Sequence, residues 1–413
     1  MDSVASPKSA EASLKSDEHD ALVKSLMPVL IVATAIGPLA MSSFVPTIPA
    51  IKNAFGVDTA TANLTLSLSM VGMAFATLAY GPLSDRFGRR PVLIGGVALG
   101  LVGSALGVLA PTIETVIVAR ILQAAGATSG IVLARVIVQD VFGSRKAAAK
   151  LGAIASAMIV APMIGPTIGA LFADHVSWRA NFAMIALAAA ILLFVLTARL
   201  PETRKGAPDP SGPLRILKGF GARLATPGFV RFGLFGSFAQ GAFFVFMAGA
   251  PFVVTEVMDA PARVYGVWFT TLPIGFFVGA RLTSRVGERL GDMNLVRIGA
   301  AVSFFAAAAG LGLGLLGVWT PAAFFIPAAV LALGNGLSIP GAQAGAVTSA
   351  GARAGSGSSR FGFMQSVIGA ALAQTVSFFQ TAASPYPTIV MIVGAAAIAL
   401  ALAFAGARPR AAQ

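Results

Sequence analysis

The residues with the densest charge lie in the stretch GPLSDRFGRRP at 81–91, between two long apolar runs. Only 11% of the chain is charged, yet four charged residues fall within six positions here: Asp85, Arg86, Arg89 and Arg90. Gly81 and Gly88 can let helix ends approach closely, and Asp85 can lie against a neighbouring helix N-terminus. The pattern predicts a latch whose arginines pair across a gap and release in a second conformation, rather than an ordinary basic loop.

Other chemistry is limited by the residue types present. The chain has no cysteine, so disulfides, thiol catalysis and thiolate metal sites are excluded. The two histidines, His19 and His175, lie in a polar tail and a short connection. We find no nucleophile–base pair, no metal-ligand cluster and no phosphate-binding loop, and therefore expect neither an enzyme nor a cofactor or metal.

The elements that position these residues are membrane spans. The chain of 413 residues is 56% hydrophobic with a mean hydropathy of +0.84, whereas a soluble protein keeps about a quarter of its residues charged. Apolar runs of about 20 residues cross the hydrocarbon core, and twelve are present: 26–48, 60–81, 91–110, 114–138, 150–173, 178–199, 229–253, 264–284, 294–317, 321–345, 361–382 and 386–407. We expect an all-α integral membrane protein.

The spans divide into two halves around a Pro-, Gly- and Arg/Lys-rich segment. We expect these parts: a tail at 1–25, a six-helix bundle at 26–199, a linker at 200–228, a second six-helix bundle at 229–407 and a tail at 408–413. The stretch GARLTSRVGERLG at 279–291 repeats the charged turn at the same place in the second half. Parallel repeats of this kind build transporters with a central site between the halves.

Orientation follows from the loops. The two tails, the linker and alternate loops hold 24 Lys and Arg residues, and the other side holds 3. This excess predicts that both termini are cytoplasmic. The net charge of +13 is then explained by topology, and no nucleic-acid partner is expected.

These features resemble the major facilitator superfamily, and GPLSDRFGRR matches its loop 2–3 signature. More narrowly, the chain resembles the Bcr/CflA-type drug:proton antiporters over nearly its whole length. The stretches that carry this resemblance are RILQAAGA (120–127), RVIVQDVFGSRKAA (135–148), APMIGPTIGAL (161–171), WRANF (178–182), LPETR (200–204), APFVVTEV (250–257) and RAGSGSS (353–359). The resemblance implies the major facilitator fold and multidrug efflux.

Arg120 and Gln123 lie one helical turn apart in the fourth span. A guanidinium inside a membrane faces a cavity or a partner by default, and the resemblance implies a role in proton coupling or substrate binding. The alternative is an arginine that snorkels to the interface.

The fifth span carries a stripe of small residues, Gly165 and Gly169, on one face. Pro162 and Pro166 are expected to bend this span. We expect the glycine stripe to pack against the eighth span. The resemblance to an exporter signature favours efflux. Generic glycine packing is the alternative.

The cytoplasmic end of the fourth span carries Arg135 and Asp140. Asp140 could pair with Arg135 or with Arg145 and Lys146, and we expect a structural gate pair rather than a proton-carrying acid. Asp85 is expected to lie against the start of the eleventh span, near Ser358 and Ser359.

The first span differs from the sequence pattern of the family that the chain resembles. Where relatives tend to carry an acid, this chain reads GPLAMSSFVPTIP with Ser42, and no Asp or Glu lies in the middle of any predicted span. A pocket without carboxylates suits neutral, zwitterionic or anionic compounds better than cations. Helical spacing and polarity place these residues in the pocket, with packing as the alternative for each: Thr34, Met41, Ser42, Arg120, Gln123, Gln240, Phe243, Phe244, Asn335 and Gln365.

Three functions are compatible with these residues. The first is a secondary-active exporter of small amphipathic compounds that works by alternating access with protons as the coupling ion. The second is a uniporter, symporter or exchanger of one metabolite or organic anion, which Ser42 favours. The third, a membrane sensor, is disfavoured by the intact latch. We expect a monomer in the inner (plasma) membrane whose partners are the small-molecule substrate, protons and the lipid bilayer.

Overall fold

The computed structural model describes residues 7–204, 226–349, 354–381 and 384–405. In this part of the chain the secondary structure is helical apart from an isolated bridge between Thr381 and Ser384. The first half contains α1 (Pro7–Phe44), a 3₁₀ turn (Val45–Thr47), α2 (Ile48–Phe55), α3 (Thr59–Phe87), α4 (Arg89–Val108), α5 (Ile113–His175) and α6 (Trp178–Arg199). The second half contains α8 (Pro227–Phe252), a π-helical turn (Val253–Val257), α9 (Ala262–Phe269), α10 (Thr271–Leu290), α11 (Asp292–Leu315), α12 (Pro321–Ser349), α13 (Ala354–Phe379) and α14 (Tyr386–Phe404).

Eleven helical segments of the described residues are long and apolar enough to cross a membrane. They correspond to every predicted span except the eighth. Helix α1 begins at Pro7, inside the expected tail at 1–25. Residues 205–225 of the predicted linker and the predicted tail at 408–413 lie outside the described residues, so these boundaries stay predictions.

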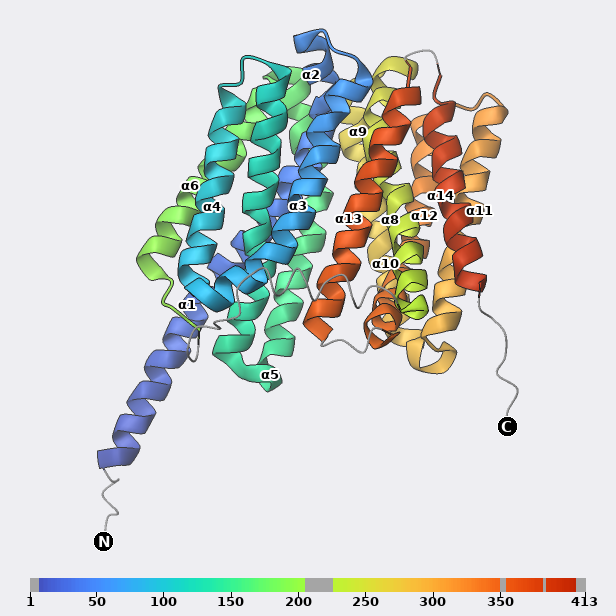
Figure 1. Cartoon of the computed structure of the whole chain (residues 1–413). Coiled ribbons are helices and arrows are strands. Elements are labelled where there is room, and N and C mark those ends of the chain that lie inside the picture. Colours follow the sequence, from blue (N-terminus) through green and yellow to red (C-terminus); the bar gives the residue numbers. More distant parts are fainter. Residues whose placement is uncertain (1–6, 205–225, 350–353, 382–383, 406–413) are drawn as a thin grey trace, which may run out of the picture.

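Helix α5 holds both the fourth and the fifth span. The two segments, Ile113–Phe142 and Lys150–His175, run side by side and the chain reverses between them (Figure 1). We predicted a loop there, and the connection is helical instead. Its sequence KAAAK, at 146–150, consists of strong helix formers, which explains the difference.

The predicted eighth span is divided between α9 and α10. Pro273 has no N–H to donate to the carbonyl of Phe269, and its ring disfavours a continuous helix, so α9 ends at Phe269. Two threonines satisfy the preceding carbonyls: Thr270 Oγ1 donates to Val267 O at 2.7 Å and Thr271 Oγ1 to Trp268 O at 2.8 Å. The break is therefore compatible with the membrane, where unsatisfied backbone groups are costly.

The two halves stand beside each other, with α1–α6 on one side and α8–α14 on the other (Figure 1). They meet where α3 packs against α13 and where α5 packs against α9. The described ends, at the start of α1 and the end of α14, lie on the same side of the molecule (Figure 1). The charged turn between α3 and α4 lies on this side too, and we call it the basic side.

Candidate transport site

A cavity of about 590 Å³ lies between the halves. Its walls come from α1, α3 and α5 of the first half and from α8, α9, α12 and α13 of the second. The lining residues are Gly37, Pro38, Met41, Ser42, Met73, Thr77, Thr128, Ile131, Val132, Arg135, Val136, Met158, Pro162, Phe243, Phe244, Met247, Phe269, Gln343, Ser358, Ser359, Gly362, Gln365 and Ser366. The volume falls within the range of small-molecule sites.

Half of the predicted pocket residues line this cavity. They are Met41, Ser42, Phe243, Phe244 and Gln365. Helical spacing predicted the correct faces of α1 and α8, and Gln365 on α13 was predicted from its polarity. Ser42 is 4% exposed and donates to the Leu39 carbonyl at 3.3 Å.

Three other predicted pocket residues are not among the lining residues. Thr34 is fully buried, and its hydroxyl donates to Leu30 O of α1 at 2.9 Å and to Gly130 O of α5 at 3.4 Å. Asn335 Nδ2 donates to Ala239 O at 3.0 Å, which ties α12 to α8 inside the second half. Gln240 is half-buried on α8. Thr34 and Asn335 thus pack helices together, the alternative that we kept open for each.

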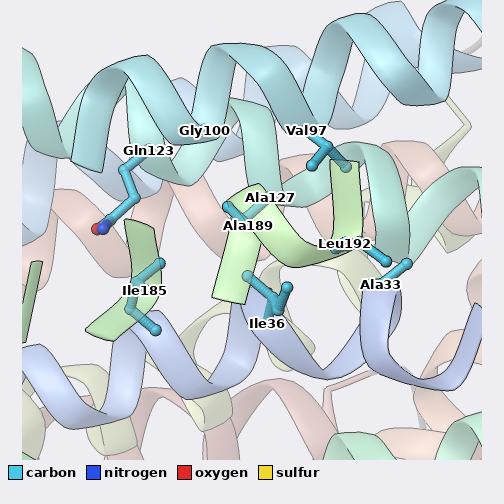
Figure 2. A pocket seen from close by; sticks show the side chains of 9 residues that line it. All are labelled: Ala33, Ile36, Val97, Gly100, Gln123, Ala127, Ile185, Ala189 and Leu192. Atoms are coloured by element: carbon cyan, nitrogen blue, oxygen red, sulfur yellow. The ribbon is translucent and has the colours of Figure 1, made fainter. Parts of the chain in front are cut away.

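Arg120 and Gln123 are buried inside the first bundle and are not among the residues that line the cavity. Arg120 is 1% exposed; its Nη1 donates to Gln123 Oε1 and to Ala40 O, and its guanidinium carbon lies 4.0 Å from the centre of the Phe44 ring. Gln123 Nε2 donates to Ser104 Oγ at 2.9 Å. Figure 2 shows Gln123 beside a void of about 10 Å³ with apolar walls, room for one water at most. The snorkelling alternative for Arg120 is wrong. Arg120 lines a second void of about 20 Å³, whose walls include Met41, Met73 and Thr128 of the cavity wall.

Arg135 lies in the cavity instead of forming the predicted gate pair. Its side chain is exposed to the cavity space, and Nη2 lies 3.3 Å from the sulfur of Met158. Asp140 pairs with Arg89, whose Nε donates to Asp140 Oδ2 at 3.1 Å. The predicted pairing of Arg135 with Asp140 is therefore wrong, because Arg89 reaches Asp140 from the neighbouring helix.

The latch residues make their contacts within the first half. Arg89 also pairs with Asp85 through Nη1, so one guanidinium bridges two carboxylates. Arg90 Nη2 donates to Thr197 O at 2.8 Å, and Arg86 lies over the Phe87 ring at 5.1 Å. The arginines thus make these contacts within the first half instead of pairing across the gap between the halves, and Asp85, expected near Ser358 and Ser359, pairs with Arg89.

The two latch glycines differ. A Cβ added at Gly81 would meet nothing within 4 Å, so the predicted close approach there is wrong. Gly88 has a φ of 101° and its Cα faces the carboxylate of Glu202, which a Cβ would overlap. Only Gly88 needs to be glycine on these grounds.

Glu202 holds the turn between α3 and α4 to the end of the first half. Its carboxylate accepts hydrogen bonds from the backbone N–H groups of Arg89, Arg90, Thr203 and Arg204 at 2.9 to 3.2 Å. Burial alone raises the pKa of this carboxyl, but the four hydrogen bonds outweigh it and lower the pKa below its ordinary value of 4.5.

Glu202→Gln is expected to lower the unfolding midpoint at pH 7, because the neutral amide loses the charge that favours the α4 N-terminus, an effect of about 0.3 to 1 kcal/mol. A carboxyl with a lowered pKa stabilises the folded state above pH 4.5 and loses this effect as the pH falls through its folded pKa. The difference between wild type and variant should therefore shrink below pH 4.5. Thermal unfolding of wild type and variant in detergent at pH 7 and at pH 4 measures the difference in midpoint and its change with pH. Glu288→Gln, at an exposed site on α10, is the control. An equal difference at both pH values would contradict the role of the charge.

The fifth-span glycines pack against α1 rather than the eighth span. A Cβ at Gly165 would overlap Ser42 Oγ, and one at Gly169 would overlap the carbonyl of Ser43. The neighbouring face of the same segment does meet the eighth span, since Thr167 Oγ1 donates to Gly266 O at 3.0 Å and a Cβ at Gly266 would lie 2.8 Å from Pro166 O. Pro162 lines the cavity. The predicted partner is thus wrong for the two glycines, and it is Pro166 and Thr167, on the neighbouring face, that contact the eighth span.

The side opposite to the basic side is closed by contacts between halves. Lys52 Nζ lies 2.6 Å from Glu256 Oε1, and these side chains are 21% and 17% exposed. Asp174 accepts hydrogen bonds from the backbone N–H groups of Ala262 and Arg263 at the start of α9. We did not predict this pairing; the scarcity of charge on the opposite side was the signal that could have shown it.

Comparison with known proteins agrees with this arrangement. The sequence profile of the Major Facilitator Superfamily matches residues 30–374. The chain is 27% identical over 377 residues to an uncharacterized MFS-type transporter, YdgK, of Bacillus subtilis, with 90% of this chain and 92% of that protein covered. It is 30% identical over 269 residues to a chloramphenicol resistance protein of Pseudomonas aeruginosa (64% and 62% covered). It is 24% identical over 336 residues to multidrug resistance protein D of Escherichia coli (78% and 81% covered).

Solved structures share the fold. The nucleoside transporter NupG superposes with a TM-score of 0.73 at 14% identity, covering 92% of this chain and 98% of that one. A D-xylose–proton symporter gives 0.71 at 15% identity, covering 91% and 97%. Identities this low support the fold alone. The profile match, the relatives and the helical architecture together establish that this chain is a multi-pass membrane transporter of the major facilitator superfamily.

Proposed function

We propose that the protein exports small amphipathic compounds from the cytoplasm by alternating access, driven by protons. The observation that carries the proposal is the cavity of about 590 Å³ between two halves that are joined on the side opposite to the basic side. Names of relatives that refer to chloramphenicol, bicyclomycin and multidrug resistance support efflux. The basic side is then cytoplasmic and the membrane is the inner membrane.

The walls of the cavity suit amphipathic compounds. Three phenylalanines and four methionines provide apolar surface: Phe243, Phe244, Phe269, Met41, Met73, Met158 and Met247. Methionine side chains adapt their shape to different ligands. Hydroxyl and amide groups such as Ser42, Thr128 and Gln365 supply hydrogen bonds that orient a bound molecule.

A second candidate function is transport of one organic anion by uniport, symport or exchange. It is favoured by the charge of the lining residues that the structure describes, which include Arg135 and no carboxylate. Conventional proton antiport uses an embedded group with a movable pKa, and Ser42 stands where relatives tend to carry an acid.

Flux into reconstituted proteoliposomes separates the two functions. With chloramphenicol as probe, an exporter coupled to protons should transport at least several-fold faster when a pH gradient is imposed, and a protonophore should remove this stimulation. Equal flux with and without the gradient would reject proton coupling. Flux equal to that of liposomes without protein, for chloramphenicol and for further amphipathic probes, would reject efflux.

A further inference from the structure

Among the described residues that line the cavity, Arg135 is the one charged side chain. The other polar lining groups are hydroxyls and amides. The potential inside the cavity is therefore positive, and the surrounding apolar walls strengthen it relative to water.

Arg135 is poorly satisfied by the protein. A guanidinium offers five N–H donors, and the hydrogen bond that Arg135 makes to described side chains ends on the thioether of Met158, a weak acceptor. The nearest acid along α5, Asp140, is paired with Arg89, and Arg89 is also paired with Asp85. Both carboxylates of this region are thus committed to another arginine, which leaves Arg135 with donors for a ligand.

The part of the wall that the second half contributes includes an aromatic cluster. Phe243, on α8, lies 5.9 Å from Phe244 and 6.0 Å from Phe269 of α9, measured between ring centres. This cluster belongs to the second half, whereas Arg135 belongs to the first. A ligand that contacts both would have one anionic group and a flat apolar body, and it would bridge the two halves.

We propose that Arg135 is the specificity-determining residue of the cavity and that it binds the carboxylate of an aromatic or similarly bulky monoanion, whose body packs on Phe243, Phe244 and Phe269. The planar guanidinium matches a carboxylate with two parallel N–H···O bonds. One cationic lining residue suits one negative charge. The inference rests on the proposed transport function and adds the charge and shape of its substrates.

Binding of matched probes to the purified full-length protein in detergent tests the proposal. The probes are 2-naphthoate, its neutral isostere 2-naphthamide, and acetate, which keeps the carboxylate without the ring; equilibrium dialysis gives each affinity. We expect wild type to bind 2-naphthoate at least ten-fold more tightly than either 2-naphthamide or acetate. Equal or weaker binding of the naphthoate relative to the amide would overturn the proposal.

Substitutions at Arg135 test whether this residue causes the preference for the anionic probe. Arg135→Gln should bind 2-naphthoate and 2-naphthamide equally, and Arg135→Lys should keep a reduced preference because it retains charge without the bidentate geometry. Arg281→Gln, an exposed site on α10 outside the cavity, should behave as wild type. A ten-fold preference that survives in Arg135→Gln would reject Arg135 as its source. If Arg135→Gln does not fold, the proposal is tested by comparing Arg135→Lys with wild type. An unchanged preference of Arg135→Lys for 2-naphthoate over 2-naphthamide would reject the bidentate contact.

The test separates this inference from the proposed function. Charge-selective binding without any flux in proteoliposomes would leave the anion site in place and reject transport of these compounds. Flux of amphipathic compounds without a preference for the anion would support transport and reject the role of Arg135.

Discussion

Gly169→Ala is expected to destabilise the protein strongly, with a corresponding loss of transport. The added Cβ would overlap the carbonyl oxygen of Ser43 and would lie 2.6 Å from its carbonyl carbon and 3.0 Å from its Cα. These are backbone atoms that cannot rotate away, so α1 and α5 must separate. Overpacking of this kind costs about 1 to 3 kcal/mol, and more where backbone must shift.

The matched control is Gly152→Ala in the same helix. No atom lies within 4 Å of a Cβ at this exposed position, and alanine is favoured over glycine in a helix by about 1 kcal/mol. The control should therefore unfold at the same or a higher temperature than wild type, while Gly169→Ala unfolds at a lower one. Thermal unfolding in detergent compares the three proteins. A Gly169→Ala protein as stable as the control would show that α1 and α5 do not approach this closely.

Glu256→Gln is expected to open the side opposite to the basic side. Its carboxylate faces Lys52 of the other half at 2.6 Å, and Lys52 also lies 5.5 Å from the centre of the Phe252 ring. Loss of one partner of a largely buried ion pair leaves the other charge uncompensated. We expect a cost of about 1 to 2 kcal/mol for this conformation, which changes the ratio of the two conformations by a factor of about 5 to 30.

A chain without cysteine makes this change measurable. Ser366→Cys, in the cavity wall, gives one thiol for a membrane-impermeant reagent added to either face of a vesicle. With Glu256→Gln, labelling from the side opposite to the basic side should rise relative to the parent. The exchange of both charges, Lys52→Glu with Glu256→Lys, should restore the parental ratio. An unchanged ratio in the single variant would mean that the pair does not control the closure.

Helical periodicity predicted the spans and several faces of the site. A stripe such as Phe243, Phe244 and Gln240 follows from residue spacing, and two of these three line the cavity. The spacing of residues predicts which face of a helix lines the cavity, but it does not predict how far the cavity extends along the helix axis. Gln240 therefore shared the correct face of α8 and still lies outside the lining residues.

Partner choice could not be predicted from the residues. Asp140 had Arg135 close to it in sequence, yet Arg89 binds it because α3, α4 and α5 meet at this height. The glycine stripe of the fifth span indicated a close approach, but the identity of the opposing helix depends on tilts that a single sequence does not encode. Arg120 illustrates the same limit, since its polar contacts with Gln123 and Ala40 lie within the bundle.

The break between α9 and α10 has a mechanical consequence. Bending an intact transmembrane helix ruptures backbone hydrogen bonds, each worth several kcal/mol in lipid, whereas at Pro273 the helical bond to Phe269 is already missing. The hydroxyls of Thr270 and Thr271 keep their hydrogen bonds to the carbonyls of Val267 and Trp268 during such a bend. Span eight can therefore bend at one point, between α9 and α10. Helix α9 stays bound to α5 through Gly266 while α10 moves with the rest of the second half. The bending energy of the transport cycle is then confined to a few backbone torsions instead of being spread along the whole span.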